Sequence, residues 1–207
     1  MAPGSLARHL SGHDRVVAES HPTGHGVSST AMVGGLVDAG HRVTAISHRH
    51  GQGRLVLTGP QLTLVQVPSR SSARAQALDG WRTERRLMVR AVHDARPDVV
   101  HGHWTYEWGL AALEAGPPTV ITARDAPLTV LRRMPDGYRL LRTALAYRVR
   151  VEGRSSTLTA VSPYLAAAWR RQMLWQHEVT VIPNMVPDDL PPGREKTDVP
   201  VLVEVAN

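Results

Sequence analysis

Two histidines, a tryptophan and a glutamate follow a short apolar run in the middle of the chain. The run from Asp98 to His101 predicts a buried strand, and a helix is predicted from Glu107 to Ala115. In open α/β sheets, ligands bind where the carboxyl ends of strands meet the amino ends of helices. We therefore expect the turn that carries His101, His103, Trp104 and Glu107 to line a ligand site.

The two histidines could also serve a second chemistry, metal binding. His101 and His103 are two residues apart, and side chains at that spacing on a strand share a face. No third ligand is evident beside them, so we expect no metal. Three more histidines near other predicted strand ends either gather with this pair around an anionic ligand or are simply solvated. They are His21, His48 and His50.

A glycine-containing loop near the start of the chain is the second candidate site. It joins a strand predicted over Arg15 to Ser20 to a helix predicted over Ser28 to Ala39. Gly24 and Gly26, on either side of His25, let the backbone approach a ligand closely. The N-terminus of the following helix favours an anion at the same place.

Dinucleotide binding at this loop is disfavoured. Ser29 stands at the third glycine position of the dinucleotide fingerprint. The strand predicted over His41 to Ser47 ends without an acidic residue that could bind a ribose hydroxyl. Arg49 leaves NADP open, because an arginine can accommodate a 2′-phosphate. The other alternative is a plain tight turn between strand and helix.

The composition narrows the class of protein. The chain has 207 residues, enough for about one domain, and no cysteine, which excludes disulfides and thiol catalysis and fits a cytoplasmic setting. Its net charge of +6 comes from arginine, since Lys196 is the only lysine. This favours anionic ligands, unless it reflects only genomic base composition. No apolar run approaches the ~20 residues of a membrane span. Nucleic-acid binding is not expected, because phenylalanine is absent and the tryptophans are scattered.

Strands alternate with helices along the rest of the chain. Strands are predicted over 62–67, 119–122, 158–162 and 179–182, and helices over 81–95, 128–153 with a break near Pro135, and 163–173. We therefore predict an α/β fold, with a Rossmann-like, doubly wound, mainly parallel sheet and helices on both faces.

Four segments are expected: a loose N-terminal tail at 1–14, the Rossmann-like domain at 15–186, a proline-rich linker at 187–200, and at 201–207 the first strand of a further domain. We also expect the polar segment 69–80 to be a mobile loop.

Arginines alternate with apolar residues in the later helices. In the helix over 81–95 we expect a core of Leu87, Val89 and Val92 with the arginines outside. In 128–153, helical spacing predicts an apolar side of Leu140, Leu141, Ala144, Leu145, Tyr147 and Val151. Arg148 falls between two apolar flanks, so we expect it to snorkel, to pair with a carboxylate or to point into the ligand cleft. The other arginines form either a solvated face or a peripheral contact with an anionic membrane. They are Arg132, Arg133, Arg139, Arg142 and Arg150.

Three short motifs follow one another along the chain. They are Pro97-Asp-Val-Val-His-Gly-His-Trp104, Leu158-Thr-Ala-Val-Ser162 and Val179-Thr-Val-Ile-Pro-Asn184. With the loop from Gly24 to Gly26, they resemble the N-terminal half of a family 4 type retaining glycosyltransferase of the GT-B fold. Each motif alone is weak, but the ordered set spans most of the chain.

The resemblance implies a ligand set. In that family two Rossmann-like domains face each other across a cleft, and the N-terminal domain mainly binds the hydroxyl acceptor. The nucleotide-sugar donor is a substrate and not a cofactor. We therefore expect no cofactor and no metal. Arg124 stands where the family often places a histidine or arginine that reaches the transferred sugar, and it could neutralise phosphate or sugar-acid charge. The implied acceptor- or donor-binding residues are Gly24, His25, Gly26, His101, His103, Trp104, Arg124, Asp125, Ser162 and Asn184.

The resemblance also implies what is missing. The family's Arg/Lys pair and paired glutamates belong to the C-terminal domain, and this chain ends at Asn207. We therefore expect a truncated acceptor domain, inactive alone, whose half-site is open to water. Because the leaving phosphate is thought to help deprotonate the acceptor in retaining transfer, no catalytic residue is assigned. The alternatives are half of a sugar-nucleotide epimerase of the same architecture, or a basic membrane- or partner-docking domain.

Overall fold

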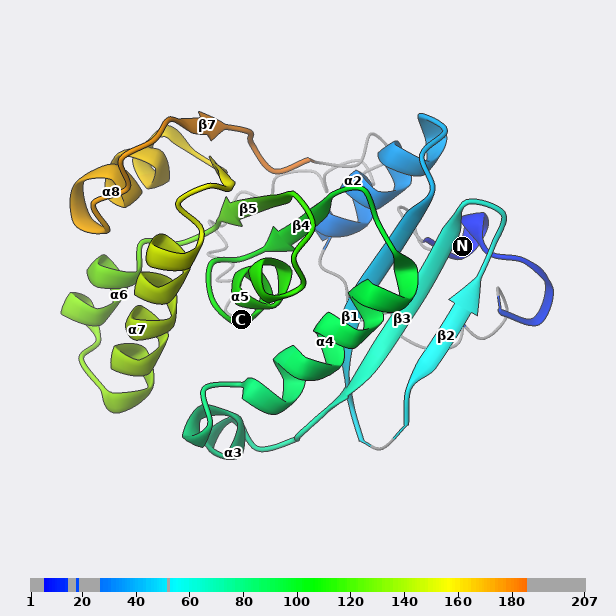
Figure 1. Ribbon diagram of the computed structural model, residues 1–207, viewed down its shortest axis with the longest axis horizontal. Coiled ribbons are helices and arrows are strands. Elements are labelled where there is room, and N and C mark those ends of the chain that lie inside the picture. The colour runs from blue at the N-terminus through cyan, green and yellow to red at the C-terminus, as the bar shows by residue number, and fades with distance from the viewer. Residues whose placement is uncertain (1–5, 15–17, 19–26, 52, 186–207) are drawn as a thin grey trace, which may run out of the picture.

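The computed structural model describes residues 6–14, 18, 27–51 and 53–185, and these form two sheets covered by helices (Figure 1). The first sheet has the strand order β1-β3-β2, with β1 parallel and β2 antiparallel to β3. The second has the order β4-β5-β6-β7 and is parallel throughout. The strands are β1 Val43–His50, β2 Leu55–Thr58, β3 Leu62–Ser69, β4 Val100–His103, β5 Thr119–Ala123, β6 Thr157–Ala160 and β7 Val179–Val181.

Helices connect the parallel strands and cover them. Helix α4 packs beside α5 and along β3, while α5 packs on β4, so this pair of helices joins the two sheets (Figure 1). The predicted Rossmann-like α/β class is confirmed by the four parallel strands and their helical connections. The helices are η1 Leu6–His9, α2 Val27–Asp38, α3 Ala73–Leu78, α4 Arg82–Ala95, α5 Glu107–Glu114, α6 Pro127–Arg133, α7 Gly137–Glu152 and α8 Pro163–Gln172.

The core is built on strands that are apolar on both faces. In β3, Leu62 and Leu64 pack into one hydrophobic cluster and Val65 and Val67 into another, as the two-residue period of a strand requires. Such a strand is typical of a parallel sheet covered on both sides. A third and larger cluster fills the second sheet around the buried Trp169.

Helix α5 crosses strand β4 of the second sheet at close range. A Cβ atom on Gly102 of β4 would lie 3.0 Å from Cα of Gly109 of α5 and 3.2 Å from the carbonyl oxygen of Trp108. The helix can therefore lie this close to the strand only because Gly102 lacks a side chain. This contact sets where α5 begins relative to the end of β4.

Several segments differ from the sequence-based expectation. The N-terminal segment was expected to be loose, but Leu6, Ala7 and Leu10 are buried against the β3 core. Strand β2 was not predicted and is antiparallel. Only Ala18 of the strand predicted over residues 15–20 is described, and its backbone is helical. The expected linker 187–200 and strand 201–207 lie outside the described residues.

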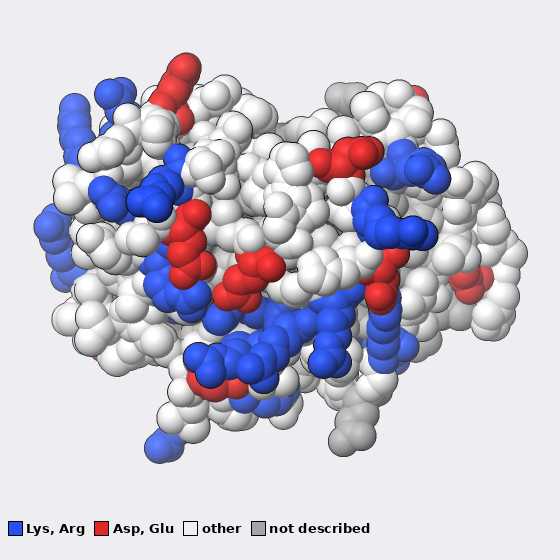
Figure 2. All heavy atoms as spheres, viewed as in Figure 1, with Lys and Arg blue, Asp and Glu red and all other residues white. Residues whose placement is uncertain are grey.

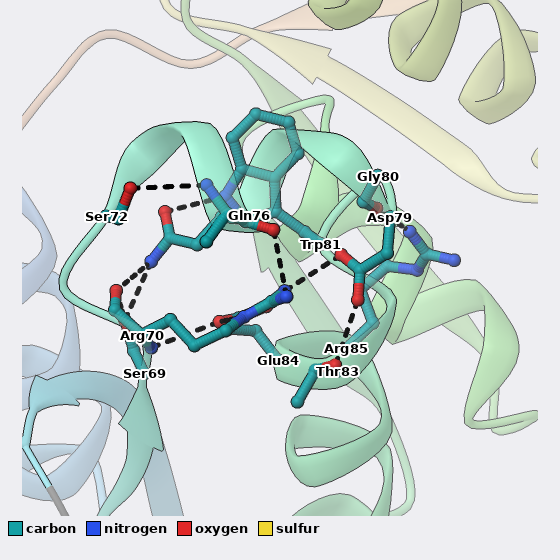
Figure 3. Close-up of polar contacts among 11 residues, drawn as sticks. Ser69, Arg70, Ser72, Gln76, Asp79, Gly80, Trp81, Thr83, Glu84 and Arg85 are labelled. Atoms are coloured by element: carbon teal, nitrogen blue, oxygen red, sulfur yellow. Dashed lines mark hydrogen bonds and ion pairs between the residues drawn. The ribbon is translucent and has the colours of Figure 1, made fainter.

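The segment expected to be a mobile loop is tied down instead (Figure 3). It contains α3, and the guanidinium of Arg70 donates from Nε to Oε1 of Glu84 at 2.9 Å and from Nη2 to Oε2 at 2.6 Å. Arg70 also donates to the carbonyl oxygen of Ala75 and to Asp79. Glu84 is fully buried on α4, where the sequence predicted an apolar face.

Carboxylates hold two arginines of α4 and α7, one of which was expected outside. Arg85 was expected outside but is buried and donates from Nε to both carboxylate oxygens of Glu114, at 3.0 and 3.2 Å. Arg148 pairs with Glu114 and Glu152, so it points at carboxylates rather than into a cleft. Of the predicted α4 core, Val92 is buried, while Leu87 and Val89 are only partly buried.

Helix α7 is rotated relative to the prediction. Leu145 is buried as expected, but Ala146 and Val149 complete the buried face. Three residues that were expected inside are exposed, namely Leu140, Tyr147 and Val151.

Candidate functional site

The predicted site residues that the structure describes gather at one edge of the four-stranded sheet. His103 ends β4, Arg124 and Asp125 follow β5, and Asn184 comes three residues after β7. Because the strands are parallel, their carboxyl ends meet at the same edge. The loop Gly24-His25-Gly26 lies outside the described residues, so its place at this edge stays a prediction.

Arg124 is held between the outer strands of this sheet. Its Nη2 donates to Nδ1 of His103 at 3.1 Å, and its Nη1 donates to Oδ1 of Asn184 at 3.0 Å. A guanidinium only donates, so Nδ1 of His103 must be the unprotonated ring nitrogen. Half-burial lowers the pKa of Arg124, but not far enough to remove its charge. The result is a cation whose orientation is set by one residue at the end of β4 and one residue after β7, the two outer strands of this sheet.

His101 begins a chain of hydrogen bonds across the sheet. Its Nε2 lies 2.7 Å from Oγ1 of Thr122, which lies 2.8 Å from Oγ1 of Thr159, and that hydroxyl donates to the carbonyl oxygen of Ile121. Since each hydroxyl has one proton, the chain orders itself with His101 Nε2 as the first donor. Although the residue reaches the surface, partial desolvation of its ring and then the charge of Arg124 lower the pKa of His101 below 6.5, which favours the neutral form with Nδ1 as its acceptor.

The two histidines form a stacked pair. The rings of His101 and His103 lie 4.2 Å apart between centroids, with 29° between their planes. Within the described ranges, no three His, Asp or Glu side chains come close enough together to hold a metal ion. His48, for which clustering with this pair and simple solvation were both left open, stacks on Trp108 at 4.2 Å, where burial lowers its pKa to about 4.

Asp125, which follows β5, lies among aromatic side chains. Its Oδ2 accepts hydrogen bonds from Nε1 of Trp104 at 3.1 Å and from the hydroxyl of Tyr106 at 2.8 Å. Burial raises the pKa of Asp125, although these two hydrogen bonds and the charge of Arg142 oppose that effect. Trp104 has a φ of 104°, a costly conformation for a residue with a side chain, and the bond to Asp125 helps to hold it.

The cation under these rings was missed by the sequence analysis. The guanidinium carbon of Arg142 lies 3.8 Å from the ring centroid of Tyr106 and 4.7 Å from that of Trp104. Arg142 had been assigned to the outer basic face, but its side chain is only 11% exposed and faces Glu107 at 3.5 Å. The helical spacing of the sequence did contain a signal for the buried position of Arg142. Arg142 precedes Leu145 and Val149 by one and two helical turns, so it shares their buried face.

The structure gives Ser162 a structural role and leaves one side of the site open to solvent. Ser162 accepts a hydrogen bond from the backbone of Leu165 and caps α8, which is a structural role. Trp104 is 36% exposed, and His101 is exposed while His103 is half-buried, so the site is open on this side, as expected. The arrangement offers one fixed cation, neutral imidazoles and an exposed indole, which suit a ligand with anionic and hydroxyl groups.

A family model described as Glycosyltransferase Family 4 matches residues 22–190, which include every strand and every site residue described above. None of the curated proteins compared with the chain matches it. In the described part of the chain, no helix combines the length and the apolarity that crossing a membrane requires.

Proposed function

Since the chain belongs to Glycosyltransferase Family 4, we propose that it is the N-terminal, acceptor-binding domain of a retaining hexosyltransferase that uses a nucleotide-sugar donor. Its general function is that of a glycosyltransferase. The observation that carries the finer proposal is the guanidinium of Arg124, fixed at the carboxyl edge of the sheet by His103 and Asn184. An arginine held by two side chains is ready to bind an oxyanion without further ordering.

The chemistry proposed for this site is binding and charge stabilisation. Arg124 would neutralise a phosphate or sugar-acid oxygen of the ligand, and the unprotonated Nδ1 of His101 would accept a hydrogen bond from a sugar hydroxyl. Asp125 would not act as a nucleophile, because its Oδ2 accepts hydrogen bonds from Trp104 and Tyr106 and its Oδ1 is buried. The departing phosphate of the donor would take up the acceptor proton, so no catalytic base is assigned to this domain.

The proposal includes the inactivity of the chain alone. Transfer also requires further groups that hold the donor from the other side of the cleft, and we place these in a second domain. We expect the purified 207-residue chain to show no sugar transfer from UDP-glucose or GDP-mannose to added acceptors. Transfer by this chain would contradict that part of the proposal.

Binding can be tested without turnover. We expect millimolar UDP-glucose or GDP-mannose to shift the imidazole NMR signals of His101 and His103, and the shift to weaken at high salt. Arg124→Gln should abolish the shift, while Arg133→Gln, a change at an exposed arginine of α6, should leave it intact. Signals that do not move, or that move equally in Arg124→Gln, would refute the assignment.

A further inference from the structure

The indole of Trp104 stands exposed at the carboxyl edge of the four-stranded sheet. Trp104 directly follows His103, the last residue of β4, and it is 36% exposed. Its Nε1 donates to Oδ2 of Asp125, so the one polar atom of the ring already has a partner within the domain. What the indole offers to a ligand is therefore apolar surface, which the guanidinium of Arg124 at the same edge does not supply.

The backbone of Trp104 has a conformation that needs support. Its φ of 104° is costly for a residue with a side chain, and it persists only where the surroundings fix it. The carbonyl oxygen of Trp104 lies against α5, since a Cβ atom on Gly109 would come within 2.9 Å of it. Strained residues of this kind cluster at ligand sites, where they aim a side chain.

Arg142 of α7 supports the indole from inside the domain. Its guanidinium carbon lies 4.7 Å from the ring centroid of Trp104 and 3.8 Å from that of Tyr106. The two rings meet edge to face with 5.5 Å between their centroids, and the hydroxyl of Tyr106 donates to the same oxygen of Asp125 as the indole does. A cation, a ring and a carboxylate thus hold the indole together.

Arg142 differs from the other arginines of this face. Figure 2 shows many Lys and Arg side chains at the surface, over α4 and at the edge where α6 and α8 lie. The side chain of Arg142 is only 11% exposed, and Glu107 offsets its charge with 3.5 Å between Oε2 and Nη1. Burying a cation is costly, and contact with aromatic rings recovers part of that cost. The buried guanidinium therefore orders the rings instead of meeting solvent.

We propose that Trp104 is a platform on which a sugar ring of the ligand stacks, and that Arg142 is the residue that positions this platform. A pyranose has C–H groups on its faces and hydroxyls around its rim. One face can therefore lie on the indole while the hydroxyls remain free for polar groups such as Nδ1 of His101. An indole that is already fixed loses little freedom when the ligand binds. The inference rests on the proposed transferase function for the source of the sugar, which is the donor or a sugar acceptor.

The positioning role is tested without ligand. The Nε1–H NMR signal of Trp104, assigned by its loss in Trp104→Phe, reports the bond to Asp125. We expect Arg142→Met to move this signal and Arg142→Lys to restore most of its position, because lysine keeps a cation beside the rings. The matched control is Arg148→Met on the same helix, where the guanidinium pairs with other carboxylates, and it should leave the signal in place.

Loss of folding is separated from loss of positioning by a second variant. Arg142→Met leaves the carboxylate of Glu107 buried without its cation, and the double variant Arg142→Met/Glu107→Gln removes that charge as well. Circular dichroism checks that both fold. We expect the Trp104 signal to be displaced in both, and an indole signal that stays in place in either would overturn the positioning role.

The platform is tested with ligands that do and do not carry a hexose. They are UDP-glucose and GDP-mannose, UDP and GDP, and the methyl glycosides of glucose and mannose. We expect the Trp104 indole signal to shift with a sugar-bearing ligand and not with UDP or GDP. A shift with the nucleotide-sugars alone identifies the hexose of the donor, and a shift with a methyl glycoside identifies a sugar acceptor.

Trp104→Gly removes the platform but keeps a residue that accepts a φ of 104°. This variant should bind the sugar-bearing ligand about tenfold more weakly, read from the histidine signals, and UDP or GDP as the parent does. Arg142→Met should weaken the same ligand by a similar factor, and Arg142→Lys should recover most of the affinity.

Two results would overturn the platform. The first is an indole signal that moves as far with UDP or GDP as with the nucleotide-sugars, since the base or the phosphates would then account for the shift. The second is an indole signal that moves with none of the ligands. If the signals of His101 and His103 still respond to nucleotide-sugars in that case, the proposed function stands and only the platform is wrong.

Discussion

Replacing Arg70 with methionine tests whether a single ion pair orders the segment between β3 and α4. Glu84 is completely buried, and Arg70 supplies it with two side-chain hydrogen bonds and a backbone bond at 3.2 Å. Removing one partner of a buried ion pair costs about 3–5 kcal/mol. The Arg70 side chain is 33% exposed, so water can reach it, and we expect the lower end, about 3 kcal/mol.

In a domain of this size that loss corresponds to a melting temperature lower by about 6–12 °C. The matched control is Arg74→Met, at an exposed arginine of α3, which should change the free energy of unfolding by less than about 0.5 kcal/mol. Urea unfolding followed by circular dichroism measures both variants. Equal midpoints for Arg70→Met and Arg74→Met would refute the reasoning.

The pH dependence of Arg70→Met provides a second check. Burial would raise the pKa of Glu84, but the hydrogen bonds and charge of Arg70 outweigh it and hold that pKa below the usual 4.5. The pair therefore stabilises the parent fully above pH 4.5 and is lost as the pH falls through the folded-state value. In the variant the side-chain hydrogen bonds and charge of Arg70 are gone and only backbone hydrogen bonds oppose burial, so the pKa of Glu84 rises relative to the parent and protonation destabilises the fold less. The stability gap between parent and variant should narrow as the pH falls from 7 toward 4, and a constant gap would contradict this account.

Two further changes test the packing around the site and a buried histidine. In Gly109→Ala the new Cβ would lie 2.9 Å from the carbonyl oxygen of Trp104, so urea unfolding should show a loss of about 1–3 kcal/mol. The control Gly137→Ala adds a Cβ with nothing within 4 Å, and a loss as large there would point to a general cost of replacing glycine. The pKa of His48 is lowered by burial from 6.5 to about 4, so the unfolded state binds a proton first as the pH falls. Between these values stability should decline by about 3 kcal/mol, and His48→Gln should remove that part of the slope; an unchanged slope would show that His48 is not its source.

Much of the second sheet could be predicted from local sequence. The apolar runs that became β5, β6 and β7 are short and closely bounded by turn or helix signals, and Pro163 after Ser162 marked the start of α8. Parallel strands then implied that the residues after them would meet at one edge. Arg124 and Asn184 were named as site residues from the family resemblance, and the parallel strands explain why their side chains meet at this edge and form a hydrogen bond.

What could not be predicted depends on contacts between distant residues. The segment 69–80 has a composition typical of a mobile loop, and its order comes from Arg70 and Glu84, which are 14 residues apart. Helix α7 has two apolar lines at helical spacing, and periodicity alone does not say which one faces the core. The choice is made by tertiary packing, which also brings Arg142 inward.

The position of Arg142 has an optical consequence. Its guanidinium carbon lies 5.4 Å from the ring centroid of Trp81 and 4.7 Å from that of Trp104, and these rings come from different elements. A positive charge beside an indole shifts the energy of its excited state, so the emission of both tryptophans depends on where α7 holds Arg142. The chain therefore contains a natural fluorescent probe, and a displacement of this helix should change the emission colour without any added label.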